Sequence, residues 1–299
     1  MKLNRYFWDT FNSVEQSIIP RLNVQSLPKA PKNYIKEIVG TIEAILGKGS
    51  IEDVVLFGSL SYDEVSDFSD VDLLVVVKES TKYSQIRNME GILKSIEIKY
   101  GYAKFPNSII TKILRVVEKT TGMFCSHFVC TRQVWEQQNF ARIFNTFRPF
   151  TWILAPEKVV LDSMKSGASS ILQNGNGVDL SLKERPYTRL QAVKSMLMNI
   201  ALFCGGLAML PFGEKNMVYI MESFKWSLRT AYFIFFKKTG KLEKAIKIAK
   251  KIGLSPTMLR RFVAFRKNLS LDLMFVLKVP LHIIHLHLLV LKYFRSFRR

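Results

Sequence analysis

The sequence predicts an α+β protein in which a small mixed β-sheet domain is followed by an all-helical domain. Short apolar runs at 54–57 and 73–77, bounded by Gly, Ser and Asp, indicate strands, whereas long helical patterns dominate beyond residue 186. Asn174-Gly175-Asn176-Gly177 is the strongest cluster of turn residues and marks the boundary between the two parts. We therefore divide the 299 residues into an N-terminal helical extension at 1–30, a sheet domain at 31–175 and a basic helical bundle at 180–299.

The first part alternates helices and strands, which is typical of a small sheet covered by helices. Apolar residues at steps of three and four predict helices at 31–47 and 81–100, and glycines end the first of them. We expect further strands at 123–131 and 158–162, separated by a helix at 133–148. The second part contains helical patterns at 186–208, 213–238, 240–252, 256–268 and 270–297, with Ser255 as N-cap before Pro256.

Charge is distributed unevenly along the chain. Residues 181–299 carry 23 Lys and Arg against 5 Asp and Glu, which accounts for +18 of the formal +20. Such a field favours an anionic partner: RNA, DNA or another polyanion, a nucleotide, an acidic protein or a membrane surface. The alternative is a solvated lysine-rich surface. Lysines recur at steps of three over 237–251, so several share one helix face, although no known RNA-binding signature accompanies them.

Cellular location is indicated by the cysteines and the N-terminus. Three cysteines without metal-binding spacing, and a start without an apolar signal segment, lead us to expect a cytoplasmic protein. Residues 271–294 are apolar, but Lys278, Pro280 and three histidines interrupt them. We therefore expect a buried amphipathic helix, or one lying along a surface, and no membrane insertion. His282, His285 and His287 do not converge on one helix face, which disfavours a metal site.

The most informative segment is 57–76, FGSLSYDEVSDFSDVDLLVV. Gly58 and Ser59 end an apolar run, and Asp70 and Asp72 precede the next one. Side chains two residues apart share a strand face, so the two carboxylates form a candidate site for a hard divalent cation. A glycine allows phosphate to approach the backbone closely, and a serine adds a hydroxyl and an N–H group. Together these residues suit metal-assisted phosphoryl or nucleotidyl transfer, and the alternative is a polar hairpin with solvated aspartates.

Gly58, Ser59, Ser69, Asp70 and Asp72 resemble the signature of the nucleotidyltransferase superfamily, which includes DNA polymerase beta, CCA-adding enzymes and aminoglycoside nucleotidyltransferases. The resemblance implies transfer of a nucleoside monophosphate from an NTP, with ATP binding expected, to an acceptor that the sequence leaves open. It implies that Asp70 and Asp72 are catalytic ligands of Mg²⁺ or Mn²⁺. It also implies that Gly58, Ser59 and Ser69 bind the nucleotide.

The family's third carboxylate is not evident in this sequence. It should lie on the strand beside Asp70 and Asp72, and the strand predicted at 123–131 contains no acid. His127 or Ser126 occupies the expected position, so His127 is a candidate substitute base or ligand, or simply a strand histidine with a local hydrogen bond. Glu118 and Glu136 flank the strand. The alternative function is therefore a catalytically degenerate protein that binds nucleotide or RNA.

Overall fold

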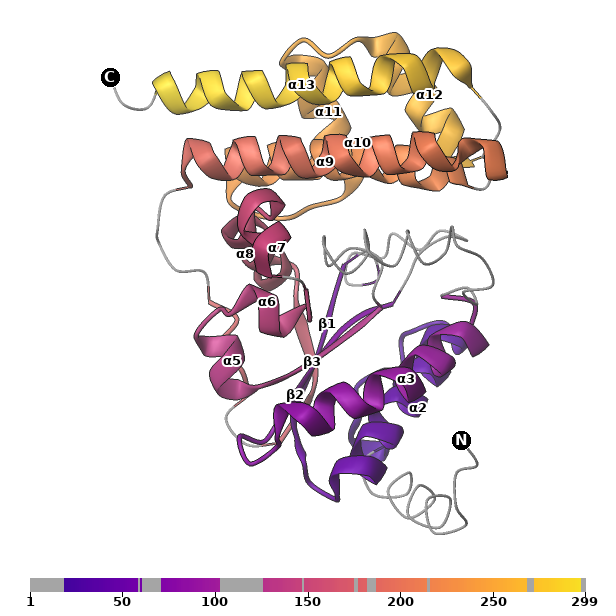
Figure 1. Cartoon of the computed structure of the whole chain (residues 1–299), viewed down its shortest axis with the longest axis vertical. Coiled ribbons are helices and arrows are strands. Elements are labelled where there is room, and N and C mark those ends of the chain that lie inside the picture. The colour runs from indigo at the N-terminus through magenta and orange to yellow at the C-terminus, as the bar shows by residue number, and fades with distance from the viewer. Residues whose placement is uncertain are drawn as a thin grey trace. The chain divides into compact units, whose positions relative to one another are not determined.

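The structure is a computed structural model, and it describes residues 19–58, 60, 71–102, 126–146, 148–174, 177–181, 187–213, 216–267 and 272–296. These residues form two compact units. The first takes its residues from within 1–107, 123–145 and 168–181, and the second from within 146–167 and 182–299. The architecture is α+β, as the sequence predicts, with a small mixed sheet in the first unit and helices in the second (Figure 1).

The sheet of the first unit has four strands in the order β3-β2-β1-β4. Strand β1 (Ile51–Phe57) is antiparallel to β2 (Asp72–Val77) and to β4 (Ser169–Gln173), while β2 runs parallel to β3 (His127–Thr131). The end of β1 and the starts of the other three strands therefore lie at the same edge of the sheet.

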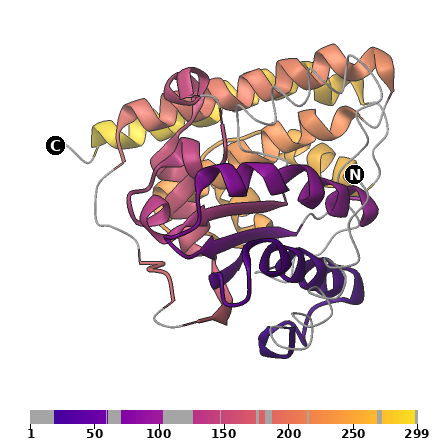
Figure 2. The same cartoon turned by 60° about the horizontal axis from the view of Figure 1, so that its bottom comes forward.

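Helices α2 (Lys29–Leu46) and α3 (Tyr83–Lys99) pack on the sheet, and Figure 2 shows the strands next to both helices. Their buried faces share one core with alternate strand residues; those contributed by β1, β2 and β3 are Ile51, Val54, Leu56, Leu73, Val75, Val77 and Val129. The buried Glu43 carboxylate accepts hydrogen bonds from Gly49 N (2.7 Å) and Ile51 N (3.0 Å), which fixes the turn between α2 and β1.

Two predicted elements of the first part were wrong. The region 158–162 is not a strand, because it lies within helix α8 (Glu157–Ser166), which follows Pro156 and buries Val159, Leu161 and Met164. A short apolar run has no clear periodicity, and here the proline before it starts a helix. The single helix predicted at 133–148 is instead α5 (Arg132–Glu136) and α6 (Phe140–Ile143), and α7 (Arg148–Leu154) follows.

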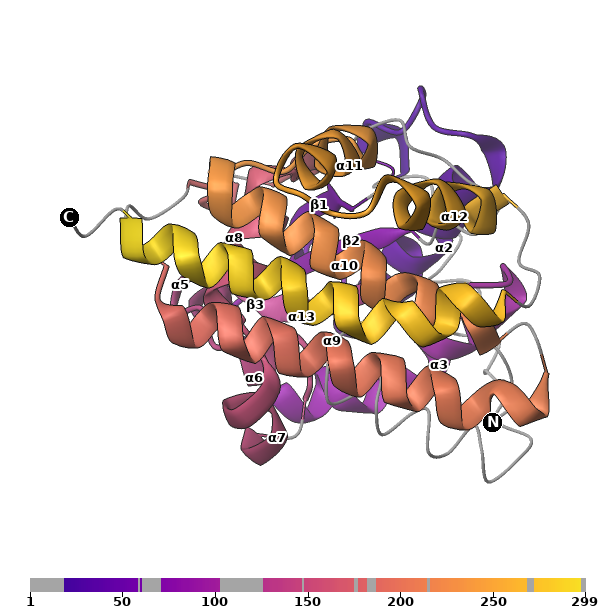
Figure 3. The same ribbon diagram turned by 90° about the horizontal axis from the view of Figure 1, so that it is seen from above.

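The second unit is a helical bundle. After α7 and α8 come the helices α9 (Arg189–Met209), α10 (Met217–Phe236), α11 (Leu242–Lys251), α12 (Pro256–Lys267) and α13 (Leu273–Ser296). The short 3₁₀ turn η3 (Leu210–Phe212) follows α9. A second 3₁₀ turn, η1 (Ile19–Arg21), belongs to the first unit and precedes α2. Ser255 caps α12 as predicted, since its hydroxyl accepts from Met258 N at 3.4 Å. Figure 3 shows α13 lying along α9 and α10.

Two helices of this bundle are long and apolar enough to cross a membrane by length and composition alone. They are α9 and the part of α13 from Leu273 to Lys292, and no other helix of the described ranges meets that test. Each also buries one face in the protein: Phe275, Ile283 and Leu286 of α13 are fully buried in the bundle core. Core helices of this length have the same composition, so packing in the bundle explains why the buried face of each helix is apolar.

Candidate functional site

Gly58 and Asp72 lie together at the sheet edge where β1 ends and β2 begins. Phe57, the last residue of β1, pairs with Asp72, the first residue of β2. Gly58 follows directly and has a backbone φ of +78°, a conformation in which an L side chain is strained. The sheet register therefore brings the predicted phosphate-binding glycine and a predicted metal-binding carboxylate to one corner.

Asp72 can lie this close to position 58 only because residue 58 is glycine. A Cβ atom at position 58 would lie 1.8 Å from Asp72 Oδ2 and 2.7 Å from Asp72 Cγ, well inside any allowed contact. The carboxylate of Asp72 thus occupies the space that any other side chain at 58 would need. Asp72 is half-buried, so its carboxylate is held by the strand while remaining partly accessible to a ligand.

Ser59, Ser69 and Asp70 lie outside the described residues. Their predicted roles in nucleotide and metal binding, and the shared face of Asp70 and Asp72, stay predictions.

His127 lies on the opposite face of the sheet from Asp72. It pairs with Leu73, whose side chain is in the core with α2 and α3, and paired strand residues point to the same side. Its Nδ1 atom is 3.0 Å from Glu97 Oε1 and 3.2 Å from Tyr34 Oη, so it contacts α3 and α2. Strand β3 runs beside β2 as expected, but the structure brings His127 to the helices and not to the Asp72 carboxylate.

The Asp72 face of β3 contains no acid within the described residues. Phe128 is stacked against Phe57, the partner of Asp72, at a centroid distance of 6.0 Å. Cys130 follows on that face, and burial raises the pKa of its thiol far above the usual value, with a smaller contribution from Glu79. Glu136 ends helix α5, which begins where β3 stops, and the five residues of β3 separate that point from Asp72 by about 16 Å. Glu118 lies outside the described part of the chain.

Glu97 anchors the start of β3 and was not singled out by the sequence. Its buried carboxylate accepts from Ser126 N (2.9 Å), contacts His127 and pairs with Lys94 Nζ at 2.7 Å. Burial opposes its ionisation, but His127 and Lys94 outweigh burial, so the pKa of Glu97 lies below its usual value. The sequence does contain a signal for Glu97, because this acid stands next to Ile96 on the apolar face of a predicted helix. An unpaired carboxylate would be costly there, so a partner could have been expected.

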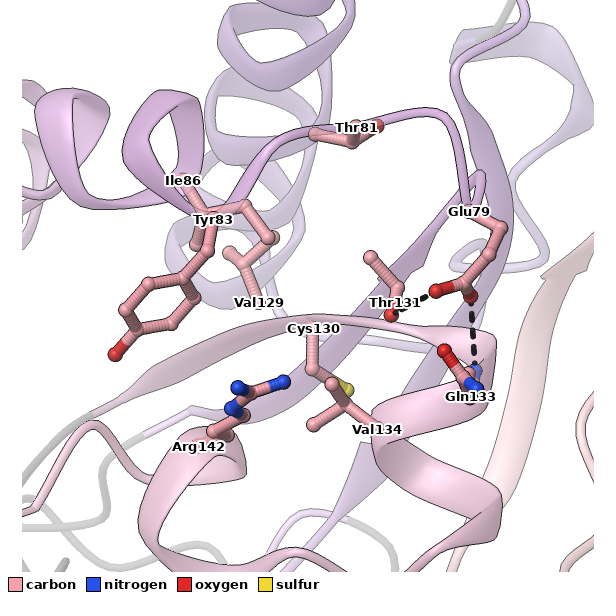
Figure 4. A pocket seen from close by; sticks show the side chains of 10 residues that line it. All are labelled: Glu79, Thr81, Tyr83, Ile86, Val129, Cys130, Thr131, Gln133, Val134 and Arg142. Atoms are coloured by element: carbon pink, nitrogen blue, oxygen red, sulfur yellow. Dashed lines mark hydrogen bonds between the residues drawn. The ribbon is translucent and has the colours of Figure 1, made fainter.

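A cavity of about 130 Å³ lies at the opposite ends of β2 and β3, away from Asp72 (Figure 4). Glu79 borders it, accepting from Thr131 Oγ1 (3.1 Å) and Gln133 N (3.0 Å), so this acid serves to join the end of β2 to α5. Arg142 points toward Cys130 from the other side. The cavity is therefore distinct from the Gly58–Asp72 corner.

The histidines of α13 form no metal site among the described residues. His287 is buried, with Nδ1 at 2.8 Å from Ile283 O and Nε2 at 3.2 Å from Ser195 Oγ, while His285 is exposed. Burial lowers the pKa of His287 to about 4, so it is neutral in the fold.

Comparison with known proteins identifies the class. Residues 40–117 match the family model described as Polymerase beta, Nucleotidyltransferase, and the match includes β1, Gly58, Asp72, β2 and α3. This match confirms the resemblance to the nucleotidyltransferase superfamily that the Gly-Ser and Asp-x-Asp signature indicates.

The chain is also similar to a solved structure. The crystal structure of spectinomycin adenyltransferase AAD(9) from Enterococcus faecialis with ATP and spectinomycin is 13% identical and has a TM-score of 0.48, covering 85% of this chain and 98% of that chain. No curated protein sequence matches this chain.

Proposed function

We propose that this protein is a metal-dependent nucleotidyltransferase that transfers a nucleoside monophosphate from an NTP to an acceptor and releases pyrophosphate. The observation that supports it best is the contact between Gly58 and Asp72, because it brings the glycine of the signature beside a strand carboxylate. The family match over the same residues supports the same chemistry.

The donor set fits a hard divalent cation. Asp72 offers a half-buried carboxylate oxygen fixed by the strand register, and Gly58 has no side chain to obstruct that oxygen. We propose that Asp70 and Asp72 hold Mg²⁺ or Mn²⁺, which when bound would neutralise the charge of the triphosphate and of the leaving pyrophosphate. Gly58 and Ser59 would donate backbone N–H groups to phosphate oxygens, with Ser69 beside them.

In the proposed transfer, an acceptor oxygen forms a bond to the α-phosphorus while the bond from that phosphorus to the bridging oxygen breaks. The acceptor proton must leave to a base. Among the described residues of β3, the Asp72 face offers Phe128 and the protonated Cys130, neither of which is a base at neutral pH. This observation favours a second candidate function, nucleotide binding without efficient turnover, unless an acid outside the described residues completes the site.

The exposed lysines of α11 support a proposal about the partner. Lys244, Lys247 and Lys251 are exposed, whereas Leu242, Ala245 and Ala249 are buried, so the helix presents its basic side to solvent. We propose that this face attracts a polyanion such as RNA. Both thiols described, Cys130 and Cys204, are free, which is compatible with the cytoplasmic location proposed from the sequence.

A transfer screen tests the proposal. Each of the four NTPs, labelled at the α-phosphate, is incubated with Mg²⁺, the full chain and three acceptor classes: RNA, protein and small alcohols. Label transfer to one class, with equimolar pyrophosphate and loss of both in Asp72→Asn, is the expected result. NTP binding without transfer or pyrophosphate would favour the second function, and absence of both binding and transfer would reject both candidates.

A further inference from the structure

Helix α13 is apolar on two opposite faces. Its inner face supplies fully buried residues to the bundle core: Phe275, Val276, Val279, Ile283, Leu286 and Val290. Its outer face carries six further large apolar side chains that are 39% to 66% exposed: Leu273, Met274, Leu277, Leu281, Ile284 and Leu288. A helix that only completes a bundle core needs the first set and not the second.

The six exposed residues form one continuous stripe, which we call the outer stripe. At 100° per residue they fall within an arc of about 100°, and from Leu273 to Leu288 they extend for about 22 Å along the helix. Isolated exposed leucines are ordinary, but a contiguous apolar patch of this length marks an interaction surface.

A basic row borders the outer stripe. Lys278, His285 and Lys292 recur at intervals of seven, so they lie along one edge of it, and all three are exposed. Helix α13 contains no Asp or Glu. Residues 181–299 as a whole carry a net +18, so the part of the chain that contains α13 is strongly basic.

The positive charge around the outer stripe distinguishes between two possible partners, a second copy of the chain and an anionic lipid surface. A second copy of the chain would bring two basic rows and two positive bundles together, at a cost in repulsion. An anionic lipid surface would receive the apolar side chains below its headgroups and attract the basic row at the same time. We propose that the outer stripe of α13 docks on an anionic lipid bilayer, lying in its surface without spanning it, because the inner face stays in the bundle core.

Vesicle flotation with the full chain tests the proposal. We expect binding to phosphatidylcholine vesicles that contain about one-third phosphatidylglycerol, at least tenfold stronger than to pure phosphatidylcholine at about 0.1 M salt, and weakened as salt screens the attraction. Equal affinity for the two vesicle types, or binding to neither, would overturn the proposal.

The stripe itself is tested by Leu277→Gln/Leu281→Gln/Leu288→Gln, which keeps the net charge. A matched control, Trp152→Gln/Ile153→Gln/Val263→Gln, changes three apolar side chains of α7 and α12 that are also exposed. We expect the stripe variant to bind at least tenfold more weakly and the control to bind within threefold of wild type, with circular dichroism unchanged in both. Equal losses in the two variants would overturn the assignment to α13.

The basic row and the alternative occupant have their own readouts. Lys278→Gln/Lys292→Gln should reduce the preference for anionic vesicles while leaving weak binding to neutral ones. Light scattering of the lipid-free protein should show a monomer. A dimer that is abolished by the leucine-to-glutamine variant would assign the stripe to a second copy and overturn the lipid proposal.

Discussion

The side chain of Asp72 fills the space that a Cβ atom on Gly58 would occupy, since that atom would be 1.8 Å from Asp72 Oδ2. The two residues are fourteen positions apart in sequence and become neighbours because Phe57 pairs with Asp72 across β1 and β2. The proposed phosphate-binding turn and the proposed metal-binding strand are therefore coupled sterically, and a change in one must displace the other.

Gly58→Ala should weaken Mg²⁺-dependent NTP binding by at least tenfold, because the new methyl group displaces the Asp72 carboxylate. Gly101→Ala is the matched control: Gly101 has a φ of +80°, and no described atom lies within 4 Å of its added Cβ. Both variants should lose about 1–2 kcal/mol of stability from the positive φ. Isothermal titration calorimetry should show weakened binding only for Gly58→Ala, and equal affinities would mean that the contact with Asp72 does not matter to the nucleotide.

Glu97→Gln should lower the free energy of unfolding at pH 7 by about 2–4 kcal/mol, because the ionised carboxylate holds Ser126 N, His127 and Lys94. The pKa of Glu97 is lowered in the fold, so its contribution is present above its usual value of 4.5 and is lost as pH falls through the folded pKa. Urea unfolding from pH 7 to 3 should show the wild-type and variant curves converging at low pH. A pH-independent gap would mean that ionisation of Glu97 is not the cause.

His127→Ala should reduce stability without reducing chemistry in the folded protein. The imidazole contacts Glu97 and Tyr34 on the helix side of the sheet, on the other face from Asp72. We expect Mg²⁺-dependent NTP affinity and turnover per folded molecule to stay within about twofold of wild type. In free energy, a twofold change is less than half of the roughly 1.4 kcal/mol that a tenfold change represents. Loss of turnover with intact folding, or increased turnover in His127→Asp, would instead make position 127 part of the site.

The buried side chain of His287 should make the stability of the protein depend on pH in the acid range. Its pKa falls to about 4 in the fold, so between its usual 6.5 and about 4 the unfolded chain binds a proton that the folded chain does not. Stability should therefore fall by about 3 kcal/mol as pH decreases across that window. His287→Gln should flatten this dependence, whereas His285→Gln, on the exposed side of the same helix, should keep it; identical pH profiles for all three proteins would reject the assignment.

The sequence predicted the strands around the signature and all five long bundle helices, because each has a clear periodicity or clear end signals. Helix α12 is the clearest case, since Ser255 and Pro256 define its start locally. Strand β4 and helix α8 were missed because their short sequences have no decisive period, and Ser169–Gln173 becomes a strand only by pairing with β1. For the site, spacing predicted the Gly58 and Asp72 corner, but the side of the sheet on which His127 lies depends on the register with Leu73. The partnership of His127 with Glu97 joins residues 30 positions apart, and no local pattern encodes it.

We propose that Asp72 binds the metal that carries the nucleotide. Calorimetric titration of ATP into wild type, Asp72→Asn and Glu79→Gln, each with Mg²⁺ and with EDTA, tests it most directly, since Glu79 is a carboxylate at the opposite end of β2. We predict that Mg²⁺ strengthens ATP binding at least tenfold in wild type and in Glu79→Gln, equivalent to about 1.4 kcal/mol, and has no effect in Asp72→Asn. Mg²⁺-dependent binding that is unchanged in Asp72→Asn would contradict the claim.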